Sequence, residues 1–237
     1  MSTVVAIHQP NFFPWLGYFD KICKSDIFVF MDNVQFPRAS RGTWINRVKM
    51  LISKEAKWII CPIKRGKGVS AVNDISIDNS TNWKEKMLRT IEHNYKKTPC
   101  FDECWEAVKS MVLYSNNNLS QYNIRNIKMI CGLLNIDGPD FIAQAGLNTH
   151  DNSTQLLIEI VKKVNGDTYL CGGGASGYQE DALFATESLE LIYQNFKQPS
   201  YRQYKTKEFI KGLSILDCLF NLGMEGTRKI LNTNGHS

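Results

Sequence analysis

A histidine and two side-chain amides stand close together near the start of the chain, in a polar loop that contains two prolines. His8, Gln9 and Asn11 follow an apolar run, residues 4–7, which predicts a short buried strand. The ordinary pKa of imidazole lies near neutrality, so His8 can take or give a proton at cytosolic pH. The two amides can orient a carbonyl, a hydroxyl or an amide of a substrate. The alternative is that His8 is a hydrogen-bonded structural residue.

Two aromatic residues and one acidic residue extend this candidate site. Trp15 and Tyr18 lie at the start of the helix that follows the loop, and they can stack on a base or a sugar ring. Asp32 ends a second apolar strand. If the two strands are parallel neighbours, Asp32 emerges at the same sheet edge as His8, where a carboxylate can fix the tautomer of a general base. The alternative is a loop aspartate that caps backbone groups.

Basic and glycine-rich segments supply candidate contacts for an anion. Arg38 and Arg41 can clamp a phosphate in a bidentate manner, and Gln35 precedes them in the same loop. A glycine-rich run follows a predicted strand and leads into a helix; its candidate residues are Gly172, Gly173, Gly174 and the nearby Tyr178. Backbone amides at a helix N-terminus suit an anion. The run has neither the dinucleotide fingerprint nor the ending of a phosphate loop, and a tight turn is the alternative.

A carboxylate lies within an apolar helical pattern near the end of the chain. Asp217 and Ser214 are three residues apart, so they share one face of the helix predicted over residues 213–222, with Gly223 as its C-cap. A buried carboxylate is unfavourable unless it is paired, which makes both residues candidates for substrate binding. The structural alternatives are an N-cap role for Ser214 and pairing of Asp217 with an arginine.

The composition argues against several classes of function. The chain has 237 residues, and its net charge of +5 is spread out, unlike the basic stripe of a nucleic-acid binder. Seven cysteines without CxxC spacing indicate reduced thiols in the cytoplasm and no zinc site. No secretory signal and no transmembrane segment are expected. The densest basic cluster, residues 64–68, is either a solvated hairpin turn or an anion-binding loop.

Strands and helices that alternate at both ends of the chain position these residues. The alternation predicts an α/β fold, with a mostly parallel Rossmann-like sheet, flanking helices and a helical insertion. Strands are expected at residues 4–8, 27–31, 44–48, 58–61, 75–77, 141–142, 167–171 and 189–193. Helices are expected at residues 14–24, 82–95, 99–114, 119–134, 156–164, 178–185 and 213–222. We expect one domain over residues 1–231, with residues 80–137 as an alternative helical subdomain, and a disordered tail over residues 232–237.

Four groups of these residues resemble the WbqC-like family. They are the run from His8 to Tyr18, Asp32 with Gln35, Tyr169 with the glycines that follow it, and the run from Leu213 to Asp217. The family occurs in bacterial gene clusters for O-antigen, the surface polysaccharide of lipopolysaccharide, and some members are described as glycine transferases. The resemblance therefore implies transfer of an acyl or aminoacyl group, such as glycyl, to the amine of a nucleotide-linked deoxy-amino-sugar.

On this hypothesis the candidate residues divide into two groups. His8 is the base, Asp32 orients it, and Gln9 and Asn11 are oxyanion donors or substrate anchors. The substrate-binding group is Trp15, Tyr18, Gln35, Arg38, Arg41, Gly172, Gly173, Gly174, Tyr178, Ser214 and Asp217. The donor is an acyl-CoA, an aminoacyl-adenylate or an aminoacyl carrier, and no metal is expected. The implied partners are a nucleotide-sugar and, peripherally, the enzymes of polysaccharide assembly.

The sequence leaves two other functions open. A non-catalytic protein that binds a sugar nucleotide or a glycan precursor would use the same aromatic and amide side chains without an organised base. An adenylate-forming or nucleotidylyltransferase-like enzyme would release pyrophosphate from ATP. The run from Pro14 to Tyr18 is similar to the HxGH turn of those enzymes, but Trp15 and Tyr18 stand where both histidines are expected.

Overall fold

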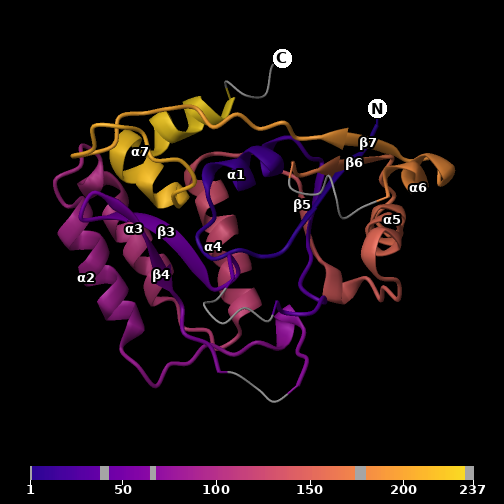
Figure 1. The fold of residues 1–237 in the computed structure, drawn as a ribbon, viewed down its shortest axis with the longest axis horizontal. Helices are drawn as coiled ribbons and strands as arrows, with labels where there is room; N and C mark the ends of the chain where they lie inside the picture. Colours follow the sequence, from indigo (N-terminus) through magenta and orange to yellow (C-terminus); the bar gives the residue numbers. More distant parts are fainter. Residues whose placement is uncertain (1, 38–42, 65–67, 174–179, 233–237) are drawn as a thin grey trace.

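A five-stranded parallel sheet organises the fold in this computed structural model (Figure 1). The structure describes residues 2–37, 43–64, 68–173 and 180–232. In spatial order the strands are β5 (Asp140–Ala143), β2 (Ile27–Phe30), β1 (Val4–His8), β6 (Thr168–Cys171) and β7 (Glu190–Tyr193). Every adjacent pair is parallel, which confirms the predicted α/β fold with a Rossmann-like sheet.

β1 is the central strand, and its two neighbours come from distant parts of the chain. On one side it pairs with β2, with His8 opposite Phe30, and on the other side with β6, with Val4 opposite Thr168. The chain therefore winds outward from β1 through β2 to β5, and then returns to β6 and β7. In open α/β sheets, ligands bind beyond the carboxyl ends of the strands where the winding reverses, which here is between β1 and β6.

Helices cover both faces of the sheet, because each strand is apolar on its two sides. The first face packs through Ala6, Phe28 and Leu170 against three helices: α1 (Leu16–Cys23), α4 (Leu119–Leu133) and α7 (Ile215–Asn232). The second face packs through Val5 and Val29 against α5 (Ser153–Lys163) and α6 (Asp181–Thr186). Figure 1 shows α5 and α6 beside β6 and β7, away from α7. Among the described residues, every helix is too short or too polar to span a bilayer.

The predicted insertion lies between β2 and β5 and contains more than helices. It holds an antiparallel hairpin, β3 (Arg47–Ile52) and β4 (Glu55–Ile60), and the helices α2 (Trp83–Tyr95), α3 (Phe101–Leu113) and α4. A short 3-10 helix at Val72–Asp74 also lies in the insertion, and a second one at Gln144–Gly146 follows β5. The buried side chains of the hairpin and of α2 to α4 belong to the same core cluster as the first face of the sheet.

The hairpin differs in position from the predicted strands at residues 44–48 and 58–61. Its strands meet at a two-residue turn in which Ser53 and Lys54 have φ values of 53° and 68°. This left-handed conformation usually carries asparagine or glycine, so Ser53 and Lys54 are no signal of a turn. The expected strand at residues 75–77 is also absent from the described chain, where Ile77 and Ser76 form only isolated bridges, with Ile63 and Asn118.

α7 continues beyond the predicted stop at Gly223. The glycine has a φ of 70° and kinks the helix, as expected for a C-cap, but a second helical segment follows and runs to Asn232. A carboxylate from α3 explains the continuation, because Glu103 Oε1 accepts a hydrogen bond from the amide of Met224 at 2.9 Å. That contact satisfies an amide at the start of the new segment. Of the expected disordered tail over residues 232–237, Asn232 ends α7 instead, and residues 233–237 lie outside the described chain.

Candidate functional site

His8 ends β1 at the reversal of the sheet, and the loop that follows fixes its imidazole. The residue is half-buried, and its Nδ1 lies 3.1 Å from the carbonyl oxygen of Gln9. Because a carbonyl only accepts hydrogen bonds, Nδ1 carries the proton and Nε2 keeps its lone pair. The ring of Tyr18 packs edge-on against the imidazole with centroids 4.8 Å apart, and its hydroxyl donates to the same carbonyl at 3.0 Å. The imidazole is thus held in the tautomer that a base at Nε2 requires.

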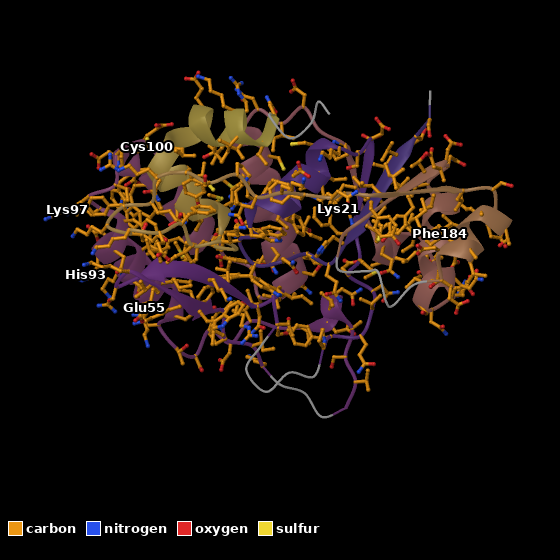
Figure 2. The ribbon with its side chains drawn as sticks, turned by 45° about the horizontal axis from the view of Figure 1, so that its top comes forward. Lys21, Glu55, His93, Lys97, Cys100 and Phe184 are labelled. Carbon is orange, nitrogen blue, oxygen red and sulfur yellow. The ribbon has the colours of Figure 1, made fainter. Side chains whose placement is uncertain are left out.

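Lys21 brings a buried positive charge to the same edge of the sheet. It extends from α1, and its ammonium donates to the carbonyl of Ile7 at 2.9 Å. A β-carbon placed on Gly172 would lie 4.0 Å from Lys21 Nζ, so the ammonium lies between the carboxyl ends of β1 and β6. Figure 2 shows Lys21 in the interior, between the sheet and the helical part of the chain. No carboxylate among the described residues forms an ion pair with it.

Burial sets the protonation of both groups. Loss of hydration lowers the pKa of Lys21 to about 8, because an unpaired ammonium is poorly stabilised in the interior. Burial, and secondarily the charge of Lys21, lower the pKa of His8 to about 4. At neutral pH the imidazole is therefore uncharged and most of the ammonium is protonated. A pair of groups with strongly shifted pKa values at this point of an α/β sheet is typical of a functional site.

Asp32 lies at the predicted edge of the sheet, but it does not contact His8 as expected. β1 and β2 are parallel neighbours, and the amide of Met31 donates to the carbonyl of His8 at 2.9 Å. The Asp32 carboxylate accepts from the amide of Ala145 at 3.0 Å and from Ser120 Oγ at 3.4 Å. Within the described chain no hydrogen bond joins Asp32 to His8. The Gln9 carbonyl orients the imidazole instead, and burial raises the pKa of Asp32.

Most of the opening loop belongs to the core. Asn11 and Phe13 are buried, and Phe13 has a left-handed φ of 42°. Neighbouring elements hold the loop backbone, since Asn123 Nδ2 donates to the carbonyl of Pro10 at 2.8 Å and Ser214 Oγ donates to that of Phe13 at 2.8 Å. Packing in the core therefore explains most of the side chains in this loop. His8 and Gln9 at its start are half-buried.

The other predicted binding residues differ in their exposure. Trp15 is half-buried at the start of α1 and packs against Phe196, with ring centroids 5.4 Å apart. Tyr18 is buried beneath the imidazole, and Gln35 is exposed in a bridge with Ala71. Gly172 and Gly173 follow β6 directly, at the reversal of the sheet. Four predicted residues lie outside the described chain: Arg38, Arg41, Gly174 and Tyr178.

Ser214 and Asp217 make the contacts of structural residues. Ser214 Oγ accepts from the amide of Leu216 at 3.2 Å, which is the geometry of an N-cap for α7. Asp217 is fully buried, and the expected arginine partner is replaced by three other donors. These are the hydroxyls of Tyr95 and Tyr201, at 2.9 and 2.6 Å, and Gln203 Nε2 at 3.1 Å.

Replacement of Asp217 by asparagine is expected to lower the free energy of unfolding by about 1–3 kcal/mol. The amide keeps one acceptor oxygen but presents an NH2 group to side chains that now donate hydrogen bonds, so part of the buried network is left unsatisfied. Urea denaturation measures the change. Asp137→Asn, at an exposed site, is the control, and an equal loss in both variants would contradict the assigned role.

Sequence reasoning missed Lys21, and only a weak signal pointed to it. The residue lies three positions after Tyr18, on a helical face that also carries apolar residues. Lysines on such faces usually extend their ammonium to solvent. Among the described residues no cluster of His, Cys, Asp or Glu side chains is arranged to hold a metal ion.

Comparison with known proteins gives one family and one relative. The sequence profile of the WbqC-like protein family matches residues 9–229. The uncharacterized protein Rv1507c of Mycobacterium tuberculosis (strain ATCC 25618 / H37Rv) is 30% identical over 225 residues, which cover 93% of this chain and 94% of that protein. No solved structure matches the chain significantly.

Proposed function

This chain belongs to the WbqC-like protein family, and we propose that it transfers an acyl or aminoacyl group to the amine of a nucleotide-linked amino sugar. One observation carries the proposal: the uncharged imidazole of His8 lies near the buried ammonium of Lys21 where the sheet reverses. Aminolysis of an acyl group needs a base for the attacking nitrogen and a positive or hydrogen-bonding group for the oxyanion. The resemblance to glycine transferases of O-antigen clusters favours glycyl as the group transferred.

His8 and Lys21 have different roles in the proposed reaction. The neutral amine of the acceptor forms a bond to the acyl carbon, and the carbonyl oxygen becomes an oxyanion that Lys21 stabilises. The nitrogen becomes acidic once it is bound to that carbon, so a weakly basic imidazole, with a pKa of about 4, can remove its proton at Nε2. Collapse of the intermediate then breaks the bond to the leaving group, which takes the proton from the imidazolium.

Backbone groups after β6 complete the proposed site. A β-carbon on Gly172 would approach only Lys21 Nζ, and one on Gly173 would meet no atom within 4 Å, so this glycine segment leaves room for a phosphate of the sugar nucleotide. In the same proposal, Gln9 and Asn11 belong to the loop that positions the reacting groups, and Asp32 acts only through its contacts with Ala145 and Ser120. The remaining substrate contacts are assigned to Trp15, Tyr18, Gln35, Arg38, Arg41, Gly174 and Tyr178. Among these residues, Gln9 has a contact with the proposed base in the structure, because its main-chain carbonyl accepts a hydrogen bond from His8 Nδ1.

The value of kcat/KM for acyl transfer, divided by the fraction of acceptor amine that is uncharged at each pH, is expected to stay constant between two unusual limits of pH. It falls below a pH of about 4, where His8 becomes protonated, and above a pH of about 8, where Lys21 loses its charge. The measurement is mass-spectrometric detection of acylated product from a UDP-linked amino sugar, with acetyl-CoA and a glycyl donor supplied in separate reactions. Circular dichroism at each pH confirms that the protein remains folded.

Two outcomes would contradict the proposal. An acid limit near 6.5, the ordinary pKa of histidine, would show that the base is not the imidazole of His8. Binding of the sugar nucleotide without product from either donor would favour the non-catalytic binding function. Release of pyrophosphate that requires both ATP and the protein would favour an adenylate-forming reaction.

A further inference from the structure

We propose that a second, basic cavity binds a diphosphate-bearing ligand at the end of the molecule remote from the sheet crevice. The cavity has a volume of about 490 Å³ and lies between the C-terminal half of α2 and the segment around Tyr204 and Lys205. Figure 2 shows His93 and Lys97 of this cavity at one end of the long axis, well separated from Lys21. Its volume falls within the usual range for small-molecule sites.

The charges around the cavity are strongly one-sided. Arg89, Lys96, Lys97 and Lys205 line it, and Glu92 is the one acidic residue among the described residues of its lining. Glu92 pairs with Lys96 at 3.3 Å. In the described chain no carboxylate forms an ion pair with Arg89, Lys97 or Lys205. Three cations therefore surround one cavity without a counter-charge, which concentrates positive potential inside it.

The helix dipole alone does not explain this arrangement. Basic residues often occupy the last turn of a helix, where they complement its negative end. Arg89, however, lies in the middle of α2, which ends at Tyr95, and Lys205 comes from a different part of the chain. An anion with at least two charges, bound between these two segments, accounts for cations that face one cavity from both sides.

An aromatic wall indicates that the ligand extends beyond its phosphates. Tyr204 is half-buried in the cavity lining, and the ammonium of Lys205 lies 5.0 Å from the centroid of its ring. The amide of Tyr204 donates to Asn221 Oδ1 at 2.9 Å, which ties this wall to α7. A cationic group beside a phenol ring suits a diphosphate joined to a sugar, a base or an isoprenyl chain. Nucleotide-linked and lipid-linked diphosphates share this chemistry.

Isothermal calorimetry with inorganic pyrophosphate tests the proposal on the full chain. The double variant Lys97→Gln/Lys205→Gln is expected to raise the Kd at least about tenfold, because two charge-assisted contacts are lost. Lys86→Gln/Lys229→Gln removes the same charge from exposed positions outside the cavity and is expected to leave the Kd within about twofold. Equal losses in the two double variants, or no binding to the wild-type protein, would overturn the proposal.

Two further measurements locate the bound ligand and identify its source. Pyrophosphate is expected to shift the imidazole NMR resonance that disappears in His93→Gln, and to bind Lys21→Met with the wild-type Kd. Loss of binding in Lys21→Met alone would assign pyrophosphate to the sheet crevice and reject this cavity. UDP-glucose and farnesyl diphosphate distinguish nucleotide-linked from lipid-linked diphosphates. The class of ligand is identified by the compound that binds more tightly and whose binding is weakened by Lys97→Gln/Lys205→Gln.

Discussion

Substitution of His8 by alanine is expected to lower the turnover of acyl transfer by about 100-fold or more, the usual contribution of a positioned general base. The variant removes the Nε2 lone pair that accepts the proton of the attacking nitrogen. It also removes a ring that packs against Tyr18, so the free energy of unfolding must be measured alongside the turnover. The assay is the mass-spectrometric one, run at neutral pH with saturating acceptor.

A second substitution separates proton transfer from positioning. His8→Asn keeps a side-chain NH2 near the position of Nδ1, where it can still donate to the carbonyl of Gln9, but it carries no base. We expect it to be as inactive as His8→Ala. His150→Ala, at an exposed site, is the matched control and is expected to keep wild-type turnover. Turnover in either His8 variant that equals the wild-type value would remove the proposed base.

Substitution of Lys21 by methionine is expected to lower kcat/KM by about 100- to 1,000-fold, the usual effect of removing an oxyanion-stabilising group. Methionine has a similar length, so it fills the space between α1 and the sheet. Because the ammonium is buried without a carboxylate partner, its loss should leave the melting temperature unchanged or raise it. The alkaline limit near a pH of about 8 should disappear from the residual activity.

The pH profile distinguishes a chemical role for Lys21 from a structural one. A lysine that only supports the fold would lower the melting temperature when replaced and would leave the alkaline limit in place. Lys86→Met, exposed on α2, provides the control for loss of one positive charge. If Lys21→Met retains both the wild-type kcat/KM and the alkaline limit, the ammonium has no part in the reaction.

Local patterns were enough to predict the architecture of the sheet. The continuous apolar runs that became β1 and β2 predicted strands buried on both faces, and such strands form parallel sheets. Helix periodicity located α2, α3 and α4 within two residues. Errors arose where a distant contact decided the outcome. The extension of α7 beyond Gly223 depends on Glu103, which lies 121 residues away from the amide it caps.

The candidate site was predicted less completely, for the same reason. The position of His8 at the end of a strand followed from the sequence, but its orientation depends on a main-chain carbonyl that no side-chain pattern reveals. Asp32 forms hydrogen bonds with Ala145 and Ser120 instead of His8, and these partners are 113 and 88 residues away in sequence. Lys21 is functional in this proposal because α1 turns it toward the carbonyl of Ile7, which is a consequence of tertiary packing.

The contacts of the first strand also constrain how the protein is made. β1 needs β6 on its second side, and Pro14 accepts a hydrogen bond from the amide of Ile215 at 2.8 Å. The segment that carries His8 can therefore complete its contacts during synthesis only after β6 and Ile215 have left the ribosome. Until then the apolar residues of β1 remain partly exposed to solvent. Pairing of strands over such long sequence separations is also slow. Nascent chains stalled before residue 215 should consequently be substrates for molecular chaperones.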